Sequence, residues 1–528
     1  MSELSSTTGI ASARFWLPSD APPRLATDRV VALAGIKLLL HLALSWRYGY
    51  FRDELYYLAC GRHLAWGYVD HAPLIAFVAR LALQMGGSLP VLRAFPAVAG
   101  SLLVALTMLI AWRLGANRFG QTLAGLCVLA VPIYLAIDSL LTMNAFEPLF
   151  WMGGVYVLIR FIQTGNSKLW IGFGVLAGLG LMNKHSTVFF GLAVIAGLLA
   201  TEYRTEFKKP WIWIGAGIAV LIFLPNLIWQ MQHHFPTLED LRNVRATGKN
   251  VVLPPLQFIS QQVMVMNPTL LLVWLAGLWS FLIGEKRRYR LLGWVFLVFF
   301  AEMMLLHGKD YYVVPIYPML LASGAVSWER VLEAWRFTQG QRWPKTATLA
   351  VVAAAGAILA PLMLPLLSPP KYLSYLKLLG FPVGKREVSE TSPFPQFLSD
   401  QFGWPDLVFQ VAQIYNSLPP TEREQTGILT GNYGGASAID EFGPKYGLPP
   451  AMSGHQTYFY WGTRGFTGHD LIVLEEDPED IQAMCNSVQA VATHSHPWGM
   501  PYENRSIYFC RGLKRPLAQI WPSLKHWD

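Results

Sequence analysis

Long apolar segments separated by short polar connections recur from the N-terminal region to residue 367. A helix needs about 20 apolar residues to cross the hydrocarbon core of a bilayer. We therefore expect about eleven membrane spans, of which the two between residues 169 and 202 are short and adjoining. The expected spans are residues 29–46, 91–112, 119–137, 145–162, 169–183, 186–202, 211–230, 267–284, 291–306, 312–328 and 346–367.

One further apolar segment, residues 73–86, has a different pattern. It is amphipathic and carries Arg80, which favours a helix lying in the membrane interface over a span. If residues 73–86 did cross the membrane, the alternation of basic and less basic connections, which is described below, would break after this segment.

The composition agrees with a membrane protein. Charged residues make up 14% of the chain, hydrophobic residues 53%, and the mean hydropathy is +0.34. Soluble proteins average about 25% charged residues, so an ordinary soluble multidomain protein is excluded. Disorder is excluded too, because it requires low hydrophobicity and high charge.

The net charge of +8 is explained by where the basic residues lie. They gather in every second connection, and cytoplasmic loops of membrane proteins carry such an excess. This pattern places the N-terminal tail, residues 1–28, in the cytoplasm and the C-terminus outside, and it gives no indication of nucleic-acid binding. The first apolar run has no cleavage site of small residues after it, so we expect a retained anchor. The basic residues are Arg113, Arg118, Arg160, Lys168, Arg204, Lys208, Lys209, Lys286, Arg287, Arg288, Arg290, Arg330, Arg336, Arg342 and Lys345.

From residue 368 to 528 the pattern changes to that of a soluble domain. Predicted helices alternate with predicted strands, which favours a small extracytoplasmic α/β domain. Cys485 and Cys510 are expected on a helix and a strand, and an oxidising compartment would permit a disulfide between them. The expected helices are 404–418, 434–446 and 478–488, and the expected strands are 426–431, 470–475, 489–493 and 505–511.

The first outside loop, residues 47–90, concentrates acidic, basic and histidine side chains. Asp53 and Glu54 are adjacent, and their repulsion is expected to raise the pKa of one of them, as a general base requires. Asp70 and His71 form a second polar pair, and Arg52 could offset the acids. A solvated loop in which a helix starts at Asp53 explains the same residues, and the sequence leaves both interpretations open.

Three other polar sites are expected at the same membrane face. Glu147 lies inside an apolar stretch, which is costly unless the carboxylate is paired or faces a cavity. Lys184 interrupts a nearly continuous apolar run. A further group of polar residues lies in the short connection between the expected spans 291–306 and 312–328. Lysine binds phosphate through charge-assisted hydrogen bonds, but a helix cap, a snorkelling turn residue or a solvated loop would look the same. The residues of that further group are His307, Lys309 and Tyr311.

Motifs of several common enzymes are absent from the sequence. There is no P-loop, no His-Glu-x-x-His, no Cys-x-x-Cys pair and no nucleophile elbow. The sequence therefore indicates no cofactor and no metal ligands, although it leaves a divalent cation open.

Five motifs in combination are more specific than any one of them. Together they resemble the membrane glycosyltransferases of family 39 in the GT-C superfamily, which includes protein O-mannosyltransferases and lipid A aminoarabinose transferases. The resemblance covers about residues 30–325 and is strongest to bacterial members that use a polyprenyl-phosphate-linked sugar. The motifs are Phe51-Arg-Asp-Glu-Leu-Tyr-Tyr57, Gly67-Tyr-Val-Asp-His-Ala-Pro-Leu74, Leu92-Arg-Ala-Phe-Pro96, Gly178-Leu-Gly-Leu-Met-Asn-Lys184 and Lys309-Asp-Tyr-Tyr-Val-Val-Pro-Ile-Tyr-Pro318.

The resemblance implies a mechanism and a location. Asp53 would accept the proton of an acceptor hydroxyl as it attacks the anomeric carbon with inversion, and Glu54 would position Asp53 or bind the acceptor. Cations would stabilise the leaving lipid phosphate; the candidates are Lys184, Lys309, His71 and Arg52. The protein would be a multi-pass protein of the bacterial inner membrane with a periplasmic C-terminal domain. The acceptor would be a glycolipid, a glycan or a protein.

The chain departs from the family pattern at the fourth span. An acidic residue is common in a Thr-x-Asp pattern there, whereas this chain has Asn144, and Glu147 lies one turn away as a substitute. Ala72 also stands where a proline is common.

Two other functions fit part of the same pattern. A transporter or flippase of a lipid-linked sugar would share the membrane helices and the intramembrane acid. A noncatalytic receptor or assembly subunit would act through the outside domain.

Overall fold

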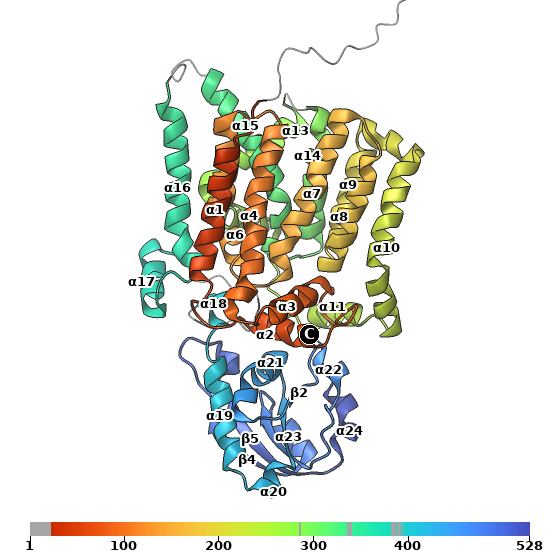
Figure 1. Ribbon diagram of the computed structural model, residues 1–528, viewed down its shortest axis with the longest axis vertical. Helices are drawn as coiled ribbons and strands as arrows, with labels where there is room; N and C mark the ends of the chain where they lie inside the picture. Colours follow the sequence, from red (N-terminus) through yellow and green to blue (C-terminus); the bar gives the residue numbers. More distant parts are fainter. Residues whose placement is uncertain are drawn as a thin grey trace, which may run out of the picture.

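The computed structural model describes residues 23–284, 287–334, 341–381, 387, 392 and 394–527. Most of the predicted cytoplasmic tail, residues 1–28, lies outside these ranges. A bundle of long helices is stacked on a smaller unit that contains a β-sheet, and short helices lie between the two (Figure 1).

The expected spans coincide with helices of the bundle. Most correspond to one helix, and those at 119–137, 267–284 and 312–328 each contain a break between two helical segments. The helices are α1 (Thr27–Leu44), α4 (Leu89–Arg113), α5 (Arg118–Ala130), α6 (Pro132–Ile137), α7 (Met143–Thr164), α8 (Leu169–Asn183), α9 (Thr187–Leu199), α10 (Pro210–Gln232), α13 (Leu271–Leu282), α14 (Arg290–Leu305), α15 (Tyr317–Ala334) and α16 (Trp343–Met363).

Fewer helices pass a test of length and composition for crossing a membrane. Within the described residues four helices do so, namely α4, α7, α10 and α16. The number rises to six if each of two sharply bent pairs is one span, and these pairs are α9 with Glu202–Lys208 and α12 (Pro255–Val265) with Pro268–Leu282. The predicted number of about eleven spans therefore stays a prediction.

The break between α5 and α6 has a local cause. Pro132 is the first residue of α6, and it has no N–H to continue the hydrogen-bond ladder of α5. The buried Asn267 donates its side-chain amide to the Ala130 carbonyl at 2.9 Å, which satisfies an acceptor at the end of α5. The predicted single span 119–137 is thus two helices because a proline interrupts it.

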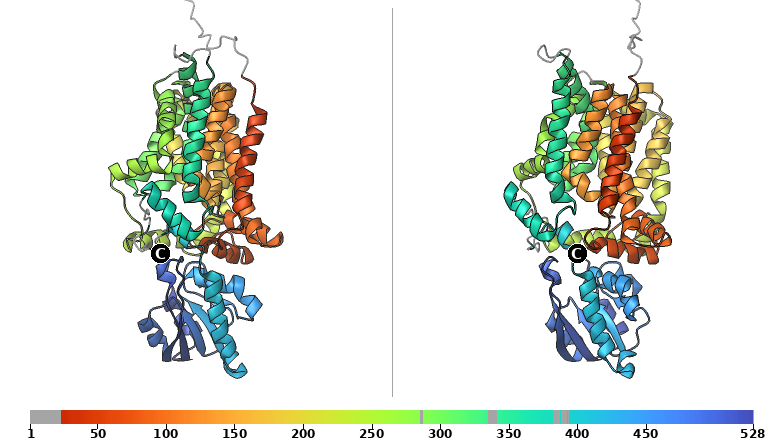
Figure 2. Two further views of the ribbon diagram at one scale, coloured as in Figure 1. Left: turned by 90° about the vertical axis from the view of Figure 1, so that its left-hand side faces the viewer. Right: turned by 60° about the vertical axis from the view of Figure 1, so that its left-hand side comes forward.

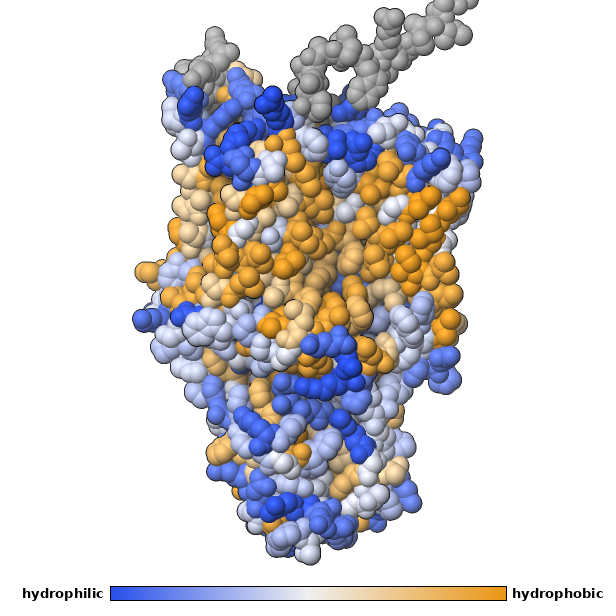
Figure 3. Space-filling model, in the orientation of Figure 1, coloured by the Kyte–Doolittle hydropathy of each residue, from blue (hydrophilic) through white to orange (hydrophobic). Residues whose placement is uncertain are grey.

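The surface of the bundle is that of a membrane protein. On the face shown, apolar residues cover the middle of the helical bundle, and polar residues gather toward both of its ends (Figure 3). The basic connections between α4 and α5, α7 and α8, and α9 and α10 lie at the end away from the β-sheet (Figures 1 and 2). The candidate site lies at the opposite end.

The first outside loop forms two short helices, α2 (Arg52–Arg62) and α3 (Leu74–Gln84). Both lie across the lower end of the bundle (Figure 1), and the interfacial position expected for residues 73–86 stays a prediction. One face of α3 is buried, including Ile75 and Ala79, while Phe77 on the other face is half exposed. Gly61 allows the two helices to approach closely, because a Cβ there would lie 2.9 Å from the Arg80 backbone nitrogen.

The C-terminal unit has a five-stranded sheet in the order β2-β1-β3-β5-β4. The first three strands are parallel, and the last two pair antiparallel with their neighbours. Helices that pack around the sheet include α19 (Trp404–Ser417), α21 (Tyr433–Phe442) and α23 (Pro478–Met484). The strands are β1 (Thr426–Thr430), β2 (Ala451–Met452), β3 (Asp470–Leu474), β4 (Cys485–Thr493) and β5 (Ser506–Leu513).

Two sequence expectations for this unit are wrong. The two-residue strand β2 was not expected, because it is too short to show a pattern. The helix predicted at 478–488 ends at Met484, and Cys485 begins β4 instead, since pairing with β5 imposes the extended conformation. Cys485 and Cys510 do form a disulfide, at a sulfur–sulfur distance of 2.01 Å.

A shared apolar core joins the C-terminal unit to the first outside loop. Buried side chains of α2 and α3, such as Leu55 and Ile75, belong to the same cluster as Trp404, Val408 and Ala436 from α19 and α21. This packing brings residues that are hundreds of positions apart in the chain to one place.

Candidate functional site

Asp53 lies in the first turn of α2 and keeps 29% of its side chain exposed. The Tyr433 hydroxyl donates a hydrogen bond to its Oδ1 at 2.8 Å, and the Arg52 Nε lies 3.8 Å from the same oxygen. Its Oδ2 accepts no hydrogen bond from the part of the chain that the structure describes. Asp53 is thus a fixed carboxylate with an available oxygen.

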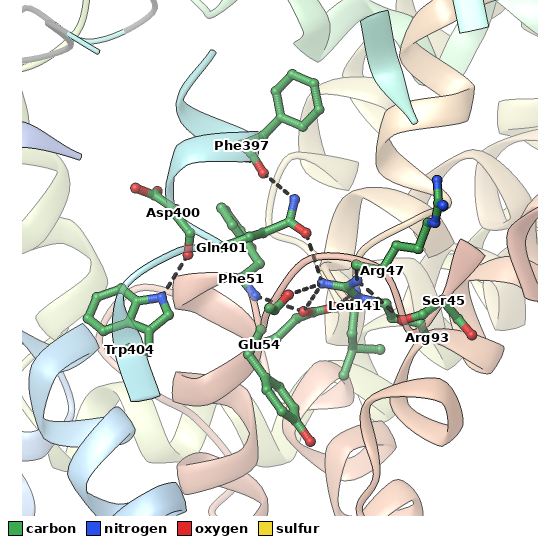
Figure 4. A network of polar contacts seen from close by, with 12 residues as sticks. Ser45, Arg47, Phe51, Glu54, Arg93, Leu141, Phe397, Asp400, Gln401 and Trp404 are labelled. Carbon is green, nitrogen blue, oxygen red and sulfur yellow. Dashed lines mark hydrogen bonds and ion pairs between the residues drawn. The ribbon is translucent and has the colours of Figure 1, made fainter. Parts of the chain in front are cut away.

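Glu54 is fully buried and points toward Arg93 (Figure 4). Arg93 donates to both of its oxygens, at 3.0 Å from Nε and 2.9 Å from Nη2. The backbone N–H groups of Phe51 and Leu141 donate to the same carboxylate at 2.9 and 3.0 Å. With four donors around it, Glu54 is suited to fixing the start of α2 rather than to contacting a substrate.

Arg52 ties this region to the segment before α19. Its backbone N–H donates to the Asp400 carbonyl at 3.1 Å, and its Nη2 lies 3.4 Å from Asp400 Oδ2. Its guanidinium lies over the Tyr433 ring, 5.5 Å from the ring centre. Arg52 therefore borders Asp53 but is already engaged with a buried carboxylate.

Asp70 is the carboxyl group of the loop whose pKa is raised, to about 7. Burial is the main cause, and the charge of Asp53 adds to it, whereas a 2.9 Å hydrogen bond from the Tyr56 hydroxyl opposes the shift. The adjacent pair Asp53 and Glu54 was expected to produce this effect by repulsion. Glu54 is paired with Arg93, and that expectation stays a prediction.

His71 does not present a cation to a ligand. It is 1% exposed, stacks on the Tyr68 ring, and has a carbonyl and the Cys60 sulfur at its two nitrogens. Burial lowers its pKa to about 4, so the ring is neutral at pH 7. The predicted contact of His71 with a phosphate is therefore corrected to a packing role.

The acid of the fourth predicted span and the lysine of the α8–α9 turn form one network. Lys184 Nζ donates to Asn144 Oδ1 at 2.8 Å and to Glu147 Oε2 at 2.9 Å. The Ser186 hydroxyl donates to the other oxygen of Glu147, and Lys184 also lies over the Tyr312 ring. These predicted site residues are thus brought together, with Lys184 already paired.

The connection between α14 and α15 supplies a second lysine. Lys309 Nζ lies 3.2 Å from Glu387 Oε1, and Asn250 forms a backbone bridge with Glu387. The charges of Lys309, Arg52 and Lys249 outweigh the effect of burial and lower the pKa of Glu387. Three cations therefore surround one carboxylate next to the loop that carries Asp53.

Two remaining predicted site residues differ in their placement. Tyr311 is half buried and close enough to Tyr57 to affect its electrostatics, as are Asp53 and Asp70. His307 is exposed at the end of α14 with a φ of 55°, and its side chain makes no hydrogen bond within the described residues. The structure thus places Tyr311 near the two aspartates. It gives no support for the predicted binding role of His307.

Sequence reasoning missed several residues of the site. Arg93 stood in a recognised motif without an assigned role, and an arginine inside an apolar segment was the available signal. Lys249 and Glu387 lie in segments without a distinctive pattern. Tyr433 follows a strand in the C-terminal unit, and nothing local indicates its contact with Asp53. Within the described ranges no group of three or more histidine, cysteine or acidic residues is arranged to hold a metal ion.

Comparisons with known proteins agree with this architecture. Residues 70–229 match a family described as dolichyl-phosphate-mannose-protein mannosyltransferase. The chain is 24% identical over 239 residues to lipid A galacturonosyltransferase RgtD from Rhizobium johnstonii, which is 44% of this chain and 49% of that protein. The chain thus matches about half the length of this curated relative.

Solved structures extend the likeness of fold to nearly the whole chain. ArnT from Cupriavidus metallidurans bound to undecaprenyl phosphate superimposes with a TM-score of 0.58 at 14% identity, over 92% of this chain and 98% of that one. Its apo state gives a TM-score of 0.56. The predicted resemblance to GT-C membrane glycosyltransferases is therefore confirmed.

Proposed function

We propose that this chain, a membrane protein with the fold of the GT-C glycosyltransferases, moves a sugar from a polyprenyl-phosphate carrier to an acceptor outside the cytoplasm. The observation that carries the proposal is the state of Asp53. It is a partly exposed, fixed carboxylate with one available oxygen, and it lies at the membrane end of an apolar bundle close to several cations. Glu54, the other candidate, is fully engaged.

The positions of these residues support the following reaction. Asp53 accepts the proton of the acceptor hydroxyl, whose oxygen forms a bond to the anomeric carbon. The bond from that carbon to the phosphate oxygen breaks on the opposite side, so the anomeric centre is inverted. The lipid phosphate leaves with the electron pair. Glu54 and Arg93 act only by fixing the start of α2.

The cations around Glu387 are the proposed phosphate site. Lys309, Lys249 and Arg52 already hold a carboxylate in a largely buried position, and a phosphate is an anion of similar hydrogen-bonding chemistry. The bound undecaprenyl phosphate of ArnT supports a lipid phosphate as the ligand here. Lys184 is a further candidate, but a ligand would have to compete with Glu147 for it.

The same end of the bundle is proposed to face the periplasm of a bacterium. The basic connections lie at the other end, where a cytoplasmic face is expected. The disulfide between Cys485 and Cys510 supports an oxidising compartment for the C-terminal unit. Residues 368–528 would then be a periplasmic domain, and the lipid tail of the donor would lie along the apolar middle of the bundle.

A direct assay tests the proposal. Purified protein is incubated with labelled polyprenyl-phosphate sugars and membrane extracts, and the labelled product identifies donor and acceptor. Asp53→Asn is expected to lower kcat by about 10²–10⁴-fold, the range for loss of a general base, while binding of polyprenyl phosphate is retained.

Glu441→Gln is the matched control, because Glu441 is paired with Arg62 on the same side of the molecule and is expected to leave transfer unchanged. Undiminished transfer by Asp53→Asn would refute the role of Asp53. No transfer from any such donor, together with movement of the lipid-linked sugar across reconstituted vesicles, would favour a transporter instead.

A further inference from the structure

The C-terminal unit directly contacts Asp53, the proposed general base. Tyr433, which donates to Asp53, is the first residue of α21 and follows the carboxyl end of β1. Ligands of α/β sheets commonly bind at the carboxyl ends of parallel strands. In this protein α2 is docked there, with its first turn against α21.

The Tyr433 ring is held in place from several sides. Its centre lies 4.7 Å from that of Tyr56 and 5.1 Å from that of His455, and the Arg52 guanidinium covers one face. The Asn432 side chain accepts the Gly434 N–H at 2.7 Å and so caps α21. Burial raises the pKa of the Tyr433 hydroxyl well above its usual value, so the hydroxyl stays a donor at pH 7.

The docking distance between the two parts is fixed by close contact. A Cβ added at Gly434 would lie 2.8 Å from Arg52 Cγ and 2.9 Å from a ring carbon of Trp404. No larger residue fits there without movement. The hydroxyl of Tyr433 is therefore held next to Asp53 by a rigid interface rather than by a flexible loop.

We propose that Tyr433 is a positioning residue for Asp53, so that the C-terminal unit completes the active site of the membrane bundle. The inference rests on the proposed role of Asp53. The hydrogen bond holds Oδ1 and leaves Oδ2 directed to the acceptor hydroxyl.

The test is Tyr433→Phe, which removes the hydroxyl and keeps the ring. We expect kcat to fall about 10-fold, the scale of a hydrogen bond to a charged group, with KM for the donor little changed. The kcat is referred to the fraction of protein that binds polyprenyl phosphate. A merely structural loss of folded protein would leave that kcat unchanged.

Tyr458→Phe is the matched control. The buried Tyr458 donates to Asp440 at 2.9 Å within the same unit, so the loss of its hydroxyl should cost similar stability without changing kcat. If Tyr433→Phe fails to fold, 3-fluorotyrosine at position 433 preserves shape and hydroxyl. Because the hydroxyl is retained, kcat should stay close to that of the natural protein, and a loss of kcat in this variant would contradict the inference.

The outcomes separate this inference from the proposed function. An unchanged kcat in Tyr433→Phe, with Asp53→Asn inactive, would overturn the positioning role and leave the general base in place. An active Asp53→Asn would overturn both. In the double variant Tyr433→Phe should cost no further activity beyond Asp53→Asn, and an additive loss would contradict the inference.

Discussion

Two neighbouring residues, Asp53 and Glu54, show how strongly the surroundings decide the role of a side chain. Both are carboxylates in the first turn of one helix. One is partly exposed and bonded to a tyrosine, and the other is buried with an arginine and two backbone donors. The chemistry available to each therefore differs completely.

The buried pair of Glu54 and Arg93 makes a prediction about stability. Glu54→Gln leaves the charge of Arg93, whose side chain is 3% exposed, without its counterion. Removing one partner of a buried ion pair costs about 3–5 kcal/mol, so we expect a clearly lower Tm. Glu441→Gln breaks a partly exposed pair with Arg62, in which the two side chains are 16% and 35% exposed, and should cost about 0–1 kcal/mol. Equal effects of the two variants on thermal unfolding would contradict the structural role of Glu54.

The raised pKa of Asp70 leads to a prediction about how the stability of the fold depends on pH. Its pKa is about 7 in the folded protein against 3.8 without burial, so between these values only the folded state keeps the proton. The contribution of Asp70 to stability is therefore present at low pH and is lost as the pH rises through 7.

Asp70→Asn removes this titration and keeps an oxygen that can accept from Tyr56. We expect its Tm relative to the natural protein to rise between pH 5 and pH 8. A difference in Tm that stays constant over this range would show that Asp70 is not the group that titrates.

At the scale of elements, local sequence decided most helices but not every boundary. The proline at position 132 divides a segment whose hydropathy is continuous, and β4 takes over residues whose local pattern favours a helix. Pairing with β5 and the disulfide hold β4 at the edge of the sheet. Strand pairing is a contact between distant residues, so a window of sequence does not contain it.

The disulfide makes a prediction at this scale. Cys485 and Cys510 are 25 residues apart, and closing a loop of that length stabilises a fold by about 3–4 kcal/mol in the chain-entropy description. Cys485→Ser or a reductant should therefore lower the Tm of the C-terminal unit. The double variant Cys485→Ser/Cys510→Ser is the control, because a reductant should not lower its Tm further. If a reductant left the Tm of the natural protein unchanged, this result would count against the disulfide.

At the scale of the whole molecule, the bundle and the C-terminal unit form one site. The sequence predicted that Asp70, Glu147, Lys184 and Lys309 share one end of the bundle, because the alternation of basic connections assigns each loop to a side. The structure links Lys184 to Glu147 and places Lys309 beside Glu387. His307 and His71 were also predicted at this end, but one is exposed and the other is buried among other side chains. The sequence did not predict this difference, because a charge pattern does not reveal which side chains are buried or turned outward.

The sequence by itself determined where the helices run, which connections lie together, and which family the chain resembles. These properties follow from hydrophobicity and charge along the chain, which act locally through transfer into lipid and through loop placement. Only the tertiary structure decided which carboxylate stays available, which one has a raised pKa, and that Tyr433 contacts Asp53 across 380 positions of sequence. Burial, ion pairing and long-range hydrogen bonds depend on neighbours that folding brings together, and therefore no local pattern specifies them.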